Sequence, residues 1–153
     1  TPGHTCRRGE KCAADYQGRV SGPFLDRIDI RIDVPAVSAT DMIGSKPGEP
    51  SVVVAQRVAT ARDIQRRRYA ELDLSGVHTN SAAPSSAIEQ IVAPDAESRD
   101  LLLKAAETFN LSARAYHRVL KVARILADLA GSETVSRPHI AEALSYRINM
   151  ANA

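Results

Sequence analysis

The segment from Arg27 to Val34 most limits the folds open to this chain, because it alone has strict strand periodicity. Its sequence, RIDIRIDV, alternates apolar and charged residues, so that the aliphatic side chains share one face of an extended strand. A lone strand can neither satisfy its backbone hydrogen bonds nor cover its apolar face. We therefore expect this segment to join a sheet that the chain itself supplies poorly.

Helical periodicity dominates the rest of the chain. A long helix is predicted from residue 51 to about residue 72, with a thin apolar stripe and several arginines on its other faces. Four shorter helices are predicted between residues 84 and 150, and their C-terminal stop signals include Asn110 and Gly131. The residues that mark the helix starts are Ser51, Ser86, Pro94 with Asp95, Ser112 and Ser136. The expected fold is mostly α, with about four bundled helices, a long preceding helix, one strand and a loop arm.

Glycine and proline divide the chain into three parts. Residues 1–24 lack periodicity and are predicted to be mostly loop, and residues 35–50 are predicted to be a linker. The predicted divisions are residues 1–50, 51–83 and 84–153.

Composition excludes several classes of protein. The 44% hydrophobic and 25% charged residues are typical of a globular protein, and a net charge of +2 is too small to imply nucleic-acid binding through bulk charge. No apolar run reaches roughly 18 residues and no signal-peptide core is present, so we expect a cytoplasmic protein without membrane contact. The chain begins with Thr1 rather than Met, which favours a piece of a longer protein.

Arg114 is a candidate anion-binding residue because it lies near the start of its predicted helix. The helix dipole disfavours a cation there but favours an incoming phosphate, which a guanidinium and the free amides can bind together. The alternative is a solvated arginine paired with a nearby carboxylate, and periodicity alone favours that alternative.

Arg27 is a second candidate, at the start of the predicted strand. It can form an edge ion pair with Asp26 or Asp29, which is the interpretation that the residues alone favour. It can also be offered across a subunit boundary to stabilise a transferring phosphoryl group.

Cys6 and Cys12 are candidate metal ligands, with His4 as a third. Their C-x5-C spacing is not a standard zinc pattern, and a tetrahedral site needs four ligands. Free cysteines in a loop are the favoured interpretation. The remaining histidines share no catalytic spacing and are predicted to be surface or cap residues; they are His78, His117 and His139.

The arginine-rich stretch from Arg57 to Arg68 can in principle contact nucleic-acid phosphates. Asp63 and Glu71 interrupt its charge, and Tyr69 is the one stacking group, so a solvated helix face is favoured. The sequence also has no G-x-x-x-x-G-K-[ST] phosphate loop. We therefore expect no ATP hydrolysis by this chain alone.

Two long blocks of the sequence resemble one known family. They are RVSGPFLDRIDIRIDVP at residues 19–35 and LSARAYHRVLKVARILADLAGSETVSRPHIAEALSYR at residues 111–147. Together they resemble the C-terminal part of magnesium-chelatase-like AAA+ ATPases of the ComM (YifB) type. In that family the Walker A and Walker B segments lie upstream of the residues matched here. The resemblance implies that the chain starts shortly after the sensor-1 region and runs to the protein's end.

The resemblance also implies residue roles. Arg27, within FLDRID, becomes the arginine finger that reaches a neighbouring subunit's nucleotide, and Arg114, within LSARA, becomes the sensor-2 arginine over the ATP phosphates. Residues 1–50 become the tail of the truncated α/β core, residues 51–83 an inserted long helix and its connection, and residues 84–153 the helical lid.

The resemblance further implies cofactors. ATP and Mg²⁺ serve the full-length protein, and none is expected to bind tightly to this chain alone. Family members carry another cysteine pair upstream, so Cys6 and Cys12 resemble half of a Zn²⁺ cluster, and no metal site is assigned to this chain alone.

For function, the family implies a homohexameric ATP-driven motor acting on DNA, linked to branch migration during natural transformation. A second hypothesis makes the parent a magnesium chelatase subunit that inserts Mg²⁺ into a porphyrin. A third is a stand-alone helical module that binds nucleic acid or protein through residues 57–68.

Overall fold

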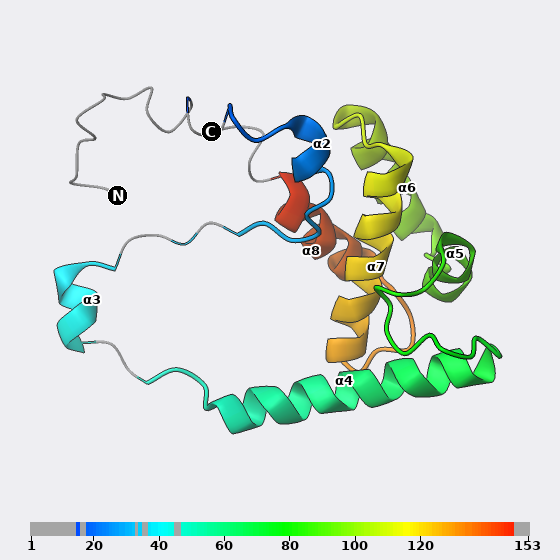
Figure 1. Ribbon diagram of the computed structural model, residues 1–153, viewed down its shortest axis with the longest axis horizontal. Helices are drawn as coiled ribbons and strands as arrows, with labels where there is room; N and C mark the ends of the chain where they lie inside the picture. Colours follow the sequence, from blue (N-terminus) through cyan, green and yellow to red (C-terminus); the bar gives the residue numbers. More distant parts are fainter. Residues whose placement is uncertain (1–14, 16–17, 33, 35–36, 45–46, 149–153) are drawn as a thin grey trace.

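The computed structural model describes residues 15, 18–32, 34, 37–44 and 47–148, and these residues are mostly helical (Figure 1). No strand occurs among the described residues, which confirms the mostly α fold. None of the described helices is both long and apolar enough to cross a membrane. The helices are α2 (Gly22–Leu25), α3 (Ala39–Gly44), α4 (Ser51–Glu71), α5 (Ser85–Val92), α6 (Ala96–Thr108), α7 (Ala113–Leu129) and α8 (Arg137–Ile148).

Helices α5 to α8 form the predicted four-helix bundle, and α7 lies at its centre. Helix α7 packs against α4, α5 and α8, while α6 packs against α8. One apolar cluster extends from Tyr69 in α4 to Leu144 in α8. The inner faces predicted for the last two helices are confirmed at the buried Val119, Leu120, Ala123 and Ala127 of α7 and Ile140, Ala143 and Leu144 of α8.

Helix α4 has the length predicted for it, and because its apolar stripe is thin, only its C-terminal half is buried. Residues 51–60 are all exposed, and burial begins only at Ala61. Gln65 and Tyr69 continue the buried face at a spacing of four residues. Figure 1 accordingly shows one end of α4 packed beneath the bundle and the other extending beyond it.

The strand predicted for residues 27–34 is not formed by the described residues of that segment. The carbonyl oxygens of Asp26, Arg27 and Ile28 accept hydrogen bonds from arginines of α7 and α8. The Arg31 amide donates to the Tyr146 carbonyl at 3.0 Å. Because the bundle satisfies these backbone groups, the segment is held without a sheet.

The predicted linker, residues 35–50, contains helix α3 at Ala39–Gly44. The Ser38 hydroxyl donates to Asp41 at 2.6 Å and accepts from the Asp41 amide at 3.1 Å. These local bonds lower the pKa of Asp41. Ser38 and Asp41 thus support a short helical turn within the predicted linker.

Most helix boundaries were predicted well, but two caps were wrong. Pro50 and Pro84 occupy the N-cap positions of α4 and α5, and neither cap residue makes a side-chain cap hydrogen bond. Ser51 is therefore inside α4 rather than its cap. The predicted capping box of Ser86 and Glu89 is not formed, and the Glu89 carboxylate instead accepts a hydrogen bond from the His117 ring at 2.8 Å.

The other predicted boundary signals are confirmed. The side chains of Asp95 and Ser112 cap α6 and α7 by accepting from the amides three residues on. Asn110 and Gly131 have positive φ angles of 47° and 68°, the left-handed geometry that ends a helix. At the start of α8, Ser136 bonds to the ring of His139, which confirms a cap role for that histidine.

Candidate functional site

The exposed start of α7 carries the candidate site. Ser112 caps the helix, and Arg114 follows within its first turn. Arg114 is exposed, and it forms no ion pair with any described residue. The carboxylate partner that the residues alone favoured for Arg114 is thus not found in the described part of the chain.

Arg114 lines a cavity of about 580 Å³ together with Arg118 and Lys121. The three cations lie at intervals of four and three residues, so they share one face of α7. His117, Asp29, the loop residue Ser81 and the first residue of α5, Ser85, also line this space. A cavity with three cations and one carboxylate in its lining suits an anionic ligand.

Lys121 holds a loop at the edge of this cavity. Its ammonium group donates to the Ser81 carbonyl at 2.9 Å and to the Ala83 carbonyl at 2.8 Å, which holds the loop before α5. Burial lowers the pKa of Lys121, and the nearby charge of Asp29 opposes that shift. Lys121 therefore contributes positive charge while its donors are largely committed to the loop.

Arg27 lies beside this face but outside the cavity. Its side chain is exposed, and its carbonyl accepts from Arg118 at 2.7 Å. The carboxylates expected to pair with it have other partners: Asp26 pairs with Arg147, and Asp29 pairs with Arg118. The structure thus brings the backbone of Arg27 close to the helix that carries Arg114, while the Arg27 side chain has no ion pair among the described residues.

The arginine-rich face of α4 is largely occupied by ion pairs within the chain. Arg57 pairs with Glu49 at 3.0 Å, and Arg66 contacts Asp63. Arg68 extends into the bundle, where it pairs with the buried Asp128. The predicted solvated face is present at the exposed Arg57 and Arg66, whose charges are paired, whereas Arg68 is partly buried against the bundle.

Asp128 is the centre of a buried polar cluster that joins α4 to α7. It accepts from Arg68 at 2.5 and 3.1 Å, from Arg124 at 3.0 Å and from Asn80 at 2.8 Å. Tyr69 donates to Asn80 at 2.9 Å. Burial lowers the pKa of Arg124, and the charge of Asp128 opposes that shift. The cluster is structural, because its donors and acceptors satisfy one another.

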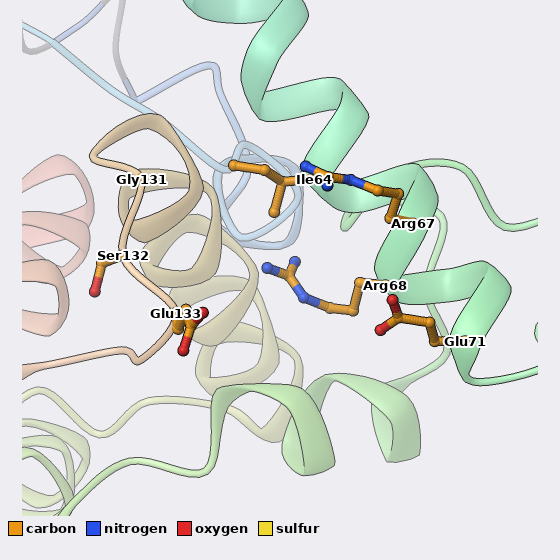
Figure 2. A pocket seen from close by; sticks show the side chains of 7 residues that line it. All are labelled: Ile64, Arg67, Arg68, Glu71, Gly131, Ser132 and Glu133. Carbon is orange, nitrogen blue, oxygen red and sulfur yellow. The ribbon is translucent and has the colours of Figure 1, made fainter.

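A second cavity, of about 380 Å³, lies between α4 and the turn after α7 (Figure 2). Its lining includes two arginines and two glutamates, so it has no net charge preference for an anion. Figure 2 shows the Arg68 side chain extending from α4 into this space. We assign it no ligand.

The predicted cysteine site cannot be placed, because Cys6 and Cys12 lie outside the described residues. Within the described part of the chain, no group of three or more His, Asp or Glu side chains is arranged to hold a metal.

Sequence reasoning missed Arg118, Lys121 and Arg147. The first two could have been found, because they follow Arg114 at helical spacing and therefore share its face. Arg147 could not, because it contacts Asp26 across more than a hundred residues of sequence.

Comparisons with known proteins agree on one family. The family described as magnesium chelatase, subunit ChlI C-terminal, matches residues 48–147, and the magnesium chelatase subunit ChlI family matches residues 1–42. The chain is 39% identical over 133 residues to the competence protein ComM of Haemophilus influenzae, which covers 86% of this chain and 25% of the relative. It is 35% identical over 153 residues to YifB of Escherichia coli, which covers 95% of this chain and 28% of the relative. The chain thus spans about a quarter of the length of these relatives.

Proposed function

Because the chain belongs to the magnesium chelatase ChlI family, we propose that it is the C-terminal lid of an ATP-dependent AAA+ motor. In this proposal the motor is a cytoplasmic homohexamer that uses ATP and Mg²⁺. Arg114 contacts the nucleotide phosphates, and Arg27 reaches the nucleotide of the neighbouring subunit. The likeness to a protein named for competence supports a motor that acts on DNA, with branch migration as the proposed activity.

The observation that carries the proposal is the state of Arg114. An arginine in the first turn of a helix is disfavoured by the helix dipole unless an anion is present. Here it is exposed beside a cationic cavity and lacks a carboxylate partner among the described residues. A phosphate group would supply the missing negative charge to both the guanidinium and the helix start.

The experiment compares three variants of the full-length protein that contains this chain. Arg27→Ala should lower kcat for ATP by about a thousandfold, the lower bound for loss of an arginine finger. Arg114→Ala should raise the KM for ATP about tenfold or more, because one charge-assisted phosphate contact is lost. Arg66→Ala is the matched control, since this exposed arginine lies on α4, away from the cavity. Turnover within twofold of wild type for both Arg27→Ala and Arg114→Ala would overturn the proposal.

The family description itself supports one alternative, a magnesium chelatase subunit that acts in porphyrin metallation. The two functions require different partners. Binding of the full-length protein to branched DNA, compared with binding to the partner subunits of a chelatase, separates them. We expect binding to branched DNA.

A stand-alone nucleic-acid-binding module gains less support from the structure. Arg57, Arg66 and Arg68 each have a carboxylate partner, so few charges on α4 are free to replace counterions on a nucleic acid.

A further inference from the structure

The segment from Asp26 to Arg31, here called the Arg27 segment, is bonded to the helical bundle by two arginines. Arg118 of α7 donates to the Arg27 carbonyl at 2.7 Å and contacts the Asp29 carboxylate. Arg147 of α8 donates to the carbonyls of Asp26 and Ile28 at 3.2 and 3.3 Å and contacts the Asp26 carboxylate. Three consecutive carbonyls are therefore bound by guanidinium groups.

Further contacts fix the same segment at both of its ends. The Ser112 hydroxyl, at the cap of α7, donates to Asp26 at 3.0 Å. Arg31 donates its amide to the Tyr146 carbonyl at 3.0 Å and its guanidinium to the Arg147 carbonyl at 2.9 Å. Figure 1 shows the chain after α2 passing alongside the end of α8. The segment thus depends on side chains from the start of α7 and the end of α8 together.

Burial makes these contacts stronger than ordinary surface ion pairs. The Arg147 side chain is 6% exposed and that of Arg118 is 26% exposed, against 55% for Arg137 in its surface pair with Glu97. Hydrogen bonds to ionised groups in partly buried positions are worth more than exposed pairs. A buried guanidinium also keeps its position, because leaving it unpaired is costly.

We propose that Arg118 and Arg147 are positioning residues for Arg27, so that Arg27 and Arg114 are carried by one rigid unit. This inference rests on the proposed function. Arg118 lies one helical turn after Arg114, so the residue that holds the Arg27 backbone shares a helix with the proposed phosphate ligand. Any movement of α7 on nucleotide binding would then also move Arg27, which acts on the neighbouring subunit. Arg118 thereby couples the nucleotide bound by one subunit to the site on the neighbouring subunit that Arg27 completes.

The first test is independent of activity and uses the chain described here. Amide hydrogen exchange is measured for wild type, Arg118→Ala, Arg147→Ala and the control Arg137→Ala, which removes an exposed arginine of the same helix as Arg147. In Arg118→Ala and Arg147→Ala, the Arg31 amide should exchange its hydrogen about tenfold faster or more, because a charge-assisted bond that holds the segment is lost. The exchange rates of the amides of α4 to α7 should not change. Arg118→Lys, which keeps the charge but loses the planar fork, should give an intermediate rate. Wild-type exchange at Arg31 in Arg118→Ala and Arg147→Ala would overturn the proposal.

The second test is a double-mutant cycle for ATP turnover in the full-length protein, with Arg27→Ala, Arg118→Ala and the double variant. Arg118→Ala should lower kcat about tenfold or more, and it should add nothing to the loss of kcat in Arg27→Ala. Additive losses would show that Arg118 acts independently of Arg27 and would overturn the positioning role. Full turnover in Arg27→Ala would instead refute the proposed arginine finger, while the exchange result would still decide whether Arg118 and Arg147 hold the segment.

Discussion

Asp128 shows how much can depend on one buried side chain. Its carboxylate is the common acceptor for Arg68, Arg124 and Asn80, and it is fully buried. Removing it would leave two guanidinium groups without their counter-charge inside the bundle. Such uncompensated charges are far more costly than the loss of an exposed pair.

We predict that Asp128→Ala lowers the free energy of unfolding by about 3 to 5 kcal/mol. Asp63→Ala is the matched control, because Asp63 contacts Arg66 on the exposed face of α4. That control should change stability by less than about 1 kcal/mol. Urea unfolding followed by circular dichroism measures both values. Equal effects in the two variants would contradict the structural role given to Asp128.

Tyr69 gives a prediction on pH at the same cluster. Burial raises the pKa of its hydroxyl to about 12, and the hydroxyl donates to Asn80. Because the folded state holds this proton more tightly than the unfolded state, the stabilisation is complete below pH 10 and is lost as the pH rises toward 12. The free energy of unfolding of wild type should therefore fall by about 2 to 3 kcal/mol more than that of Tyr69→Phe over this interval. Parallel pH profiles for the two proteins would show that Tyr69 does not titrate in this way.

At the scale of elements, the two halves of α4 differ in how they are packed. Its C-terminal half is fixed by Ala61, Gln65 and Tyr69, while residues 51–60 have no buried side chain. An isolated helical segment of this length is only marginally stable in water. The thin apolar stripe predicted from the sequence therefore corresponds to an N-terminal half of α4 that no tertiary packing within the described part of the chain stabilises.

We predict that amides in residues 54–60 exchange hydrogen at least about a hundredfold faster than amides in residues 65–71. The first group can open without disturbing the core, whereas the second requires loss of the contacts of Tyr69. Ala55→Gly, in the exposed half, should lower protection only locally and leave the melting temperature of the bundle unchanged. A lower melting temperature in Ala55→Gly would indicate packing of the N-terminal half that the structure does not show.

The Arg27 segment illustrates where element prediction failed. Its alternating residues predicted a strand, but the segment begins in a turn and forms no strand among its described residues. The need of its backbone for outside hydrogen-bond partners was real. Those partners proved to be the guanidinium groups of Arg118 and Arg147 rather than a neighbouring strand. Periodicity does not show which groups bind the backbone of a segment.

For the whole molecule, the described core is one continuous apolar cluster that joins α4 to α8. A single cluster with a shared buried polar centre predicts cooperative unfolding. Far-ultraviolet circular dichroism and near-ultraviolet tyrosine absorbance should give coincident urea transitions. Two separated transitions would show that α4 and the bundle are independent units.

The charge distribution leads to a further expectation for the isolated chain. With arginines on α4 largely paired, its binding to a DNA duplex should be weak. Fluorescence anisotropy across salt concentrations should give a slope that corresponds to no more than about two phosphate contacts. A steep slope that disappears in a triple Arg62→Ala, Arg66→Ala, Arg67→Ala variant would favour the nucleic-acid-binding module.

The sequence by itself determined the helices α4 to α8, most of their ends and the inner faces of α7 and α8, because these depend on local periodicity and capping. It also singled out Arg27 and Arg114, and their roles remain predictions. Only the tertiary structure decided that Asp128 gathers Arg68 and Asn80, and that Arg147 binds Asp26. Contacts between residues so far apart depend on how the helices pack, and no local pattern encodes them.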